Sequence, residues 1–188
     1  DGLVSNTALI AGVAASASAN TVVISGVAGL LAGAFSMALG EYTSVNTANE
    51  QIDSEVALER KSFLNSPMAE RAELVAMLIE MGMSAETAAN ATEEIHRDEH
   101  RALNFHLTQE LGVDPREKPS PWVAAIASFF LFAIGAVIPL VPYLLGFESL
   151  WAGLAFGGVG LLIAGAAAAH ITKRPLWWGS VRQLALGA

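Results

Sequence analysis

The sequence predicts an all-α protein, a polytopic helical membrane protein with one water-exposed helical insert. The charged residues are sorted along the chain of 188 residues, because 41–118 hold 16 of the 18 acids and 7 of the 10 bases. In contrast, 2–40, 119–147 and 149–172 contain no Asp, Glu, Lys or Arg. A bilayer imposes this pattern, since a spanning helix needs about 20 mostly apolar residues and a charge within it costs roughly 3 kcal/mol or more.

The first apolar segment, 2–40, is too long for a single span. At about 1.5 Å per residue it would far exceed the ~30 Å thickness of the hydrocarbon layer. The small polar stretch "SASAN" (16–20) is the expected turn, which predicts helices near 2–17 and 21–45. No proline follows the second helix at once, so we expect it to continue into the acidic stretch "GEYTSVNTANEQIDSEVALERKS".

Three further spans are predicted, near 121–144, near 148–171, and from Trp177 to the end of the sequence. Pro139 and Pro142 lie inside the third span and predict a kink, because proline frees backbone carbonyls in a membrane helix. The fifth span is short in this sequence, and we expect the natural chain to extend further at both ends. The predicted division is therefore 1–45, helices 1 and 2; 46–118, the insert; and 119–188, helices 3 to 5.

The basic residues predict the orientation in the membrane. All ten Lys and Arg fall within 60–118 or 173–182. Because cytoplasmic loops carry an excess of Lys and Arg, the insert is expected in the cytoplasm. Three tryptophans lie at the ends of predicted spans, as an aromatic belt would place them: Trp122, Trp177 and Trp178.

The insert is predicted to be helical. The stretch "NSPMAE" (65–70) is a helix start with Ser66 as N-cap, and that helix is expected to end at Gly82. The next helix is expected to start at Ser84 and to run without a break to Leu111, with Gly112 as its C-cap. With the extension of the second span, the insert would contain three helices.

Carboxylates and imidazoles recur at helical spacing in the insert. These are Glu55 and Glu59 at i, i+4; Glu70 and Glu73 at i, i+3; and His106 and Glu110 at i, i+4. Facing helices that project such side chains inward build divalent-metal sites in helix bundles. Oxygen and imidazole ligands suit Fe²⁺, Mn²⁺, Zn²⁺ or Co²⁺, and the absence of Cys excludes thiolate ligands. A solvated acidic face is the alternative interpretation. The stretch "EEIHRDEH" (93–100) also brings possible ligands close together, namely Glu93, His96, Glu99 and His100, but its charges alternate with those of Arg97 and Arg101, which favours local ion pairing.

Two residues of the apolar segments carry chemistry. Asp1 precedes an apolar helix, where it is either a functional acid at membrane depth or an N-cap at the interface. Met37, in "GAFSMALGEY", is either a packing residue or a soft thioether ligand.

Five segments together resemble the vacuolar iron transporter family over essentially the whole chain: "DGLVSNTALIAGVA", "AGLLAGAFSMALGEYTSV", "ELGVD", "IGAVIPLVPY" and "WWGSVRQLALG". The resemblance implies a homodimer with five spans per subunit, a transport path along the two-fold axis and a cytoplasmic metal-binding domain. The implied activity is export of Fe²⁺ and Mn²⁺ from the cytosol, coupled to proton counterflow.

The resemblance also implies roles for individual residues. Asp1 and Met37 match intramembrane metal ligands of the family. Four acids match carboxylates of the cytoplasmic site, namely Glu59, Glu70, Glu73 and Glu110, and His106 stands where the plant-type pattern has Met. Two positions depart from that pattern: Ser62 replaces a Glu of the insert, and Gly29 replaces a membrane Glu.

The predicted function is therefore a divalent iron and manganese transporter that works by proton antiport. It would be a homodimer in a lipid bilayer. The high alanine content of the spans favours a bacterial protein, and therefore a bacterial inner membrane. It would be no enzyme, bind no nucleic acid and hold no prosthetic group. The alternatives are a membrane-anchored ferroxidase with a di-iron insert and a metal sensor or buffer that does not transport.

Overall fold

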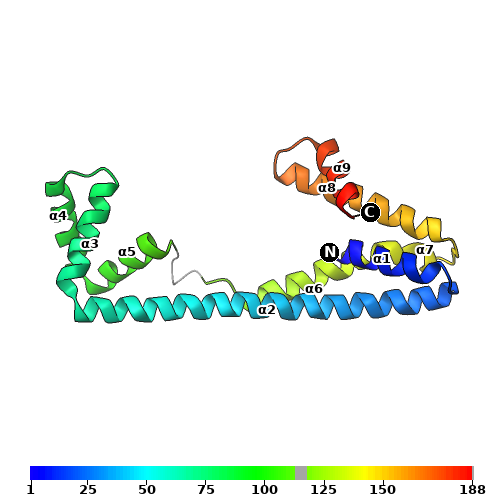
Figure 1. The fold of residues 1–188 in the computed structure, drawn as a ribbon, viewed down its shortest axis with the longest axis horizontal. Coiled ribbons are helices and arrows are strands. Elements are labelled where there is room, and N and C mark those ends of the chain that lie inside the picture. The colour runs from blue at the N-terminus through cyan, green and yellow to red at the C-terminus, as the bar shows by residue number, and fades with distance from the viewer. Residues whose placement is uncertain (113–117, 188) are drawn as a thin grey trace. The chain divides into compact units, whose positions relative to one another are not determined.

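The computed structural model of the chain describes residues 1–112 and 118–187, except for the side chains at 110 and 111. The regular secondary structure of these residues is helical throughout (Figure 1). The chain divides into two compact units, one formed by 1–43 and 121–188 and the other by 44–120. The helices are α1 (Gly2–Ala14), α2 (Ala19–Asn65), α3 (Pro67–Glu80), α4 (Ala85–Ile95), α5 (Glu99–Leu111), α6 (Pro121–Val137), the 3₁₀ turn η1 (Ile138–Leu140), α7 (Val141–Leu144), α8 (Leu150–Ile171) and α9 (Leu176–Gly187).

Helix α2 is a single helix of 47 residues that contributes to both units. Its continuation into the acidic stretch confirms the prediction from sequence. Gly40 does not interrupt it, and no other atom lies within 4 Å of where a Cβ there would be. The helix ends at Asn65 because Pro67 disfavours helical geometry at Ser66, which has φ −140° and ψ 52°.

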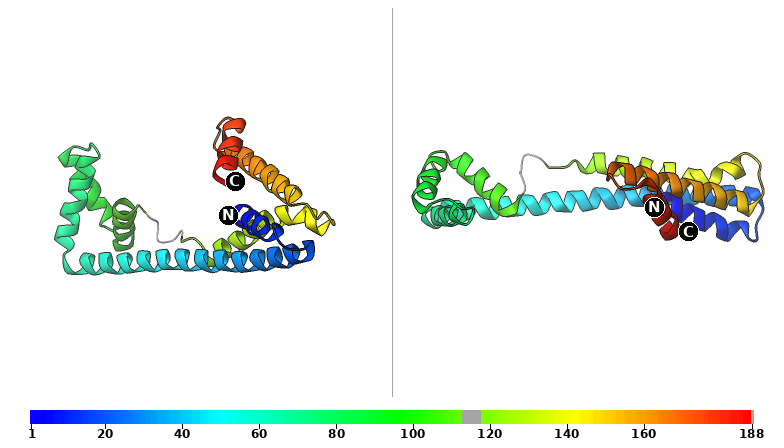
Figure 2. Two further views of the ribbon diagram at one scale, coloured as in Figure 1. Left: turned by 45° about the vertical axis from the view of Figure 1, so that its right-hand side comes forward. Right: turned by 90° about the horizontal axis from the view of Figure 1, so that it is seen from above.

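The unit formed by 1–43 and 121–188 is apolar inside and largely apolar outside. One core cluster contains Ile10, Val22, Leu140 and Tyr143, and a second contains Ala34, Phe132 and Ala136. Helices α8 and α9 cross so closely that neither Gly165 nor Gly179 has room for a Cβ (Figure 2). Large apolar side chains remain exposed on the helices, for example Leu131, Ile163 and Trp177. Such a surface suits a lipid environment.

Within the described residues, three helical segments have the length and composition to cross a membrane: Ala19–Asn65, Pro121–Leu144 and Leu150–Ile171. The predicted helix 2–17 is shorter, because α1 has 13 residues and spans only about 20 Å. Helix α9 has 12 residues. Five complete spans therefore remain a prediction from the resemblance.

The third predicted span changes geometry at its prolines, as expected. Helix α6 ends at Val137, a 3₁₀ turn with Pro139 follows, and α7 contains Pro142. Both prolines are buried, and Leu140 between them joins the first core cluster.

The unit formed by 44–120 packs α3, α4 and α5 together (Figures 1 and 2). Its core contains Leu74, Leu78 and Ala88, with Ile95 and Phe105 against them. Ser84 caps α4 as predicted by accepting a hydrogen bond from the Thr87 amide at 3.2 Å, and Gly112 ends α5 with a left-handed φ of 63°. Ser66 has the N-cap position of α3, but its side chain makes no capping bond.

The prediction of one unbroken helix from Ser84 to Leu111 was wrong. Helix α4 ends at Ile95 and α5 begins at Glu99. Asp98 has extended geometry, and its side chain accepts a hydrogen bond from the Arg101 amide at 3.0 Å. The cap starts a new helix here, because aspartate satisfies amides that a first helical turn leaves free.

Candidate metal centre

In the part of the chain that the structure describes, three helices bring together one cluster of possible metal ligands. Glu59 comes from α2, Glu70 from α3 and His106 from α5, and one ligand atom of each lies within 4.8 Å of the others. His106 Nδ1 is 3.8 Å from Glu59 Oε1 and 3.8 Å from Glu70 Oε2. Ligand atoms of one small divalent ion lie about 3 to 4 Å apart, since each bond is about 2.1 Å long. The cluster therefore has the dimensions of a coordination site.

The start of α3 positions Glu70. Pro67 occupies the first turn and Glu70 follows in the same turn, facing the end of α2. Ser62 of α2 donates a hydrogen bond from Oγ to Glu70 Oε1 at 2.5 Å. Ser62, which stands where the plant-type pattern has a Glu, thus orients the carboxylate of Glu70. The second oxygen, Oε2, is the one on the side of His106.

The environment of His106 keeps its ring neutral. The residue is fully buried, and its ring packs edge-on against Phe63 and His96, with centroids 5.4 and 5.7 Å away. Burial lowers the pKa of His106, and the Glu70 carboxylate partly opposes this effect. A neutral imidazole is the form that binds metal ions.

Burial and ligand type decide what the cluster can do. Glu70 is only 5% exposed, and Glu59 Oε1 is also buried. Two carboxylates in such a place carry a large desolvation cost, which a divalent cation offsets. Oxygen together with imidazole suits Fe²⁺, Mn²⁺, Co²⁺ or Zn²⁺.

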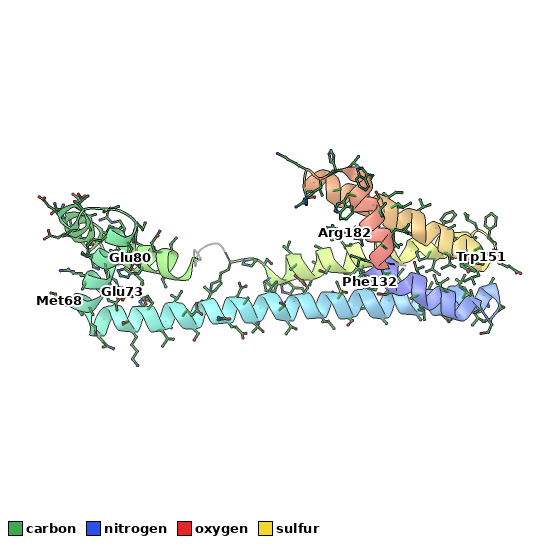
Figure 3. All side chains as sticks on the ribbon, turned by 45° about the horizontal axis from the view of Figure 1, so that its top comes forward. Met68, Glu73, Glu80, Phe132, Trp151 and Arg182 are labelled. Carbon is green, nitrogen blue, oxygen red and sulfur yellow. The ribbon has the colours of Figure 1, made fainter. Side chains whose placement is uncertain are left out.

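The other predicted site residues are placed as follows. Glu73 is exposed on α3 (Figure 3), although its charge acts on the pKa of His106. The side chain of Glu110 lies outside the described residues. Asp1 has the N-cap position of α1 without a side-chain capping bond. Met37 packs against the cluster of Ala34, Phe132 and Ala136.

Two residues near the cluster were not among the predicted ligands. Phe63 stacks in parallel on His96, with ring centroids 5.4 Å apart and planes 8° apart. His96 ends α4, inside the segment for which alternating charges favoured ion pairing. The turn at Asp98 brings His96 close to the cluster. A prediction that assumed one long helix from Ser84 to Leu111 could not indicate this position of His96.

A comparison with protein-family models matches the whole chain. The model described as the VIT family matches residues 1–188. This chain belongs to the VIT family. The resemblance stated from the motifs is therefore confirmed, and with three long apolar helices this member of the family is a membrane protein.

Two of three similar proteins carry names that refer to iron. The chain is 35% identical over 139 residues to the vacuolar iron transporter of Acanthamoeba castellanii. This match covers 71% of this chain and 52% of the amoeba protein. It is 30% identical over 184 residues to vacuolar iron transporter 1 of Arabidopsis thaliana, covering 94% of this chain and 72% of the relative. It is 28% identical over 145 residues to Protein CCC1 of Saccharomyces cerevisiae, and the match covers 76% of this chain and 45% of the yeast protein. The matched part thus spans about half of the amoeba and yeast proteins.

Proposed function

We propose that this protein transports Fe²⁺ across a membrane and that residues 46–118 form the domain that collects the ion. The observation that carries the proposal is the cluster of Glu59, Glu70 and His106 in a chain that also has three long apolar helices. Relatives named vacuolar iron transporter support iron as the ion. Mn²⁺ is the second expected ion, because it accepts the same ligand types. The proposal needs neither an enzymatic reaction nor a prosthetic group.

The proposed assembly is a homodimer with five spans per subunit and the transport path on its two-fold axis. Asp1 and Met37 of both subunits would line the path, and Glu73 and Glu110 would complete the loading site. Transport would run out of the cytosol, exchange the metal for protons and take place in a bacterial inner membrane.

The proposed cycle begins with capture. A carboxylate cluster raises the local concentration of divalent cations and replaces part of their hydration. Within the membrane, the Asp1 carboxylate and the Met37 thioether would replace more of the water, and the weak thioether keeps the ion easy to release. A proton that binds Asp1 on the far side would help to release the metal.

The test is metal flux into proteoliposomes. The full chain is reconstituted with a metal-sensitive dye inside, Fe²⁺ or Mn²⁺ outside and an imposed pH gradient. We expect dye quenching whose rate follows the gradient and which is lost in Asp1→Ala. The matched control is Glu86→Ala, since Glu86 is an exposed acid on α4 outside the cluster.

Three outcomes would replace this proposal. Normal flux in Asp1→Ala would remove Asp1 from the path. Metal binding without any flux would favour a sensor or buffer. Oxygen consumption on addition of Fe²⁺ to the reconstituted protein would favour a ferroxidase.

A further inference from the structure

His96 has one ring nitrogen whose role is set by the backbone. Its Nδ1 lies 2.9 Å from the carbonyl oxygen of Thr92, one turn earlier in α4. A carbonyl oxygen only accepts hydrogen bonds, so Nδ1 carries the proton in this contact. In the neutral ring, Nε2 then holds the lone pair. A backbone carbonyl on one nitrogen and a free lone pair on the other is the arrangement of metal-binding histidines.

The environment of His96 Nε2 lacks a hydrogen bond. The atom is buried and has no hydrogen-bond partner among the residues that the structure describes. A buried acceptor that loses water without gaining a donor costs about 1 to 3 kcal/mol. A ligand that accepts this lone pair would remove the cost.

The distance between the two imidazoles fits one shared metal ion. Their ring centroids are 5.7 Å apart, with planes at 88°. With a metal–nitrogen bond of about 2.1 Å, the ring centre lies about 3.2 Å from the metal, so two imidazoles on one ion have centroids about 4.6 to 6.5 Å apart. His96 is outside the three residues whose ligand atoms already converge within 4.8 Å. His96 Nε2 would therefore reach the ion by a small adjustment of the ring and its backbone, made while Nδ1 keeps its contact with the Thr92 carbonyl.

We propose that His96 Nε2 is a further metal ligand of this centre and makes it a site with two imidazoles and two carboxylates. The inference rests on the proposed metal-binding function of Glu59, Glu70 and His106. A second imidazole favours Fe²⁺, Co²⁺ and Zn²⁺ over Mn²⁺, and it disfavours Mg²⁺ and Ca²⁺, which take oxygen ligands. His96 therefore sets the metal selectivity of the site.

Two variants separate ligation from packing. His96→Phe keeps a planar ring that stacks on Phe63 and lacks both nitrogens. His96→Asn keeps a donor for the Thr92 carbonyl and lacks Nε2. The matched control is His100→Phe, because His100 is an exposed histidine at the start of α5.

The experiment measures Co²⁺ and Mn²⁺ binding by the full chain in detergent and counts imidazole ligands by X-ray absorption at the cobalt edge. We expect two imidazoles in the unmodified protein and in His100→Phe, and one in both His96 variants. The Co²⁺ affinity of both His96 variants should fall about 10- to 100-fold. Their Mn²⁺ affinity should fall less, so the preference for Co²⁺ narrows.

Two results would overturn the inference, and Glu70→Gln separates them from failure of the whole site. If Glu70→Gln weakens Co²⁺ binding while both His96 variants keep the imidazole count and the preference for Co²⁺, His96 is a packing residue only. If Glu70→Gln also leaves Co²⁺ binding unchanged, the proposed metal centre itself is wrong, and the inference falls with it.

Discussion

Glu70 and His106 are both buried, and each changes the cost of burying the other. Burial favours the neutral imidazole, while the neighbouring carboxylate favours the charged one, and burial is the larger effect on the pKa of His106. The Ser62 hydroxyl donates a hydrogen bond to one oxygen of Glu70 and so fixes the orientation of this carboxylate. The lowered pKa of His106 favours the neutral imidazole, which is the form that binds a divalent cation.

The lowered pKa of His106 predicts how stability depends on pH. Between the lowered pKa and the ordinary value of 6.5, the unfolded chain binds a proton at this residue and the folded chain does not. Stability of the metal-free protein therefore rises with pH in this window, and the contribution of His106 is lost as the pH falls through it. We expect the thermal midpoint of the unmodified protein, measured with a chelator, to approach or fall below that of His106→Gln as the pH drops from 7.5 to 5.

The control for this measurement is His100→Gln, which changes an exposed histidine. It should keep the pH dependence of the unmodified protein. A constant difference in midpoint between the unmodified protein and His106→Gln over the whole range would contradict the prediction.

At the scale of elements, the junction between α4 and α5 affects the geometry of the candidate metal centre. Helix α5 carries His106, and His96 is the C-cap of α4. A continuous helix would point these two side chains in directions set by its own periodicity. The turn at Asp98 instead lets their rings meet at 5.7 Å.

Removal of this cap should therefore weaken metal binding from a distance. Asp98→Ala loses the hydrogen bond to the Arg101 amide and should cost about 1 kcal/mol of stability. Because α5 then frays at its start, we expect a several-fold loss of Co²⁺ affinity by calorimetric titration of the full chain. Asp98→Asn restores the capping oxygen and should regain most of the affinity. Equal losses in both variants would assign the effect to the charge of Asp98.

At the scale of the whole molecule, different parts of the chain have surfaces suited to lipid and to water. The apolar helices carry exposed residues such as Phe130 and Trp151, which suit lipid. The charged part of the chain contains the candidate ligands Glu59, Glu70 and His106. One helix, α2, supplies residues to both units. In the proposed function, ion capture and passage through the membrane would therefore involve different parts of the same helix.

This separation predicts a kinetic signature for Glu70→Gln. If the cluster loads the path, the variant should require several-fold more Fe²⁺ for half-maximal flux and keep its maximal rate. The change lowers metal affinity at capture and leaves Asp1 and Met37 intact. Initial rates of dye quenching over a range of Fe²⁺ concentrations measure both quantities. A lower maximal rate with an unchanged half-saturating concentration would instead make the cluster a regulator.

The sequence by itself determined the membrane character, the continuity of α2 and most of the residues of the candidate metal centre. These features follow from local information: charge sorting, an uninterrupted helical stretch and carboxylates at helical spacing. Glu59, Glu70 and His106 could be named, because their residue types and the family motifs mark them.

Only the tertiary structure decided which ligands converge. Glu73 is one turn from Glu70 but exposed, while His96, from a segment that favoured ion pairing, lies beside His106. Helical spacing states which residues share a face, but the packing of α3, α4 and α5 decides which face is buried. Asp98, as the N-cap of α5, starts a new helix after α4. The residues of α5 therefore do not continue the helical periodicity of α4, and the sequence pattern could not predict which of them lie near His96.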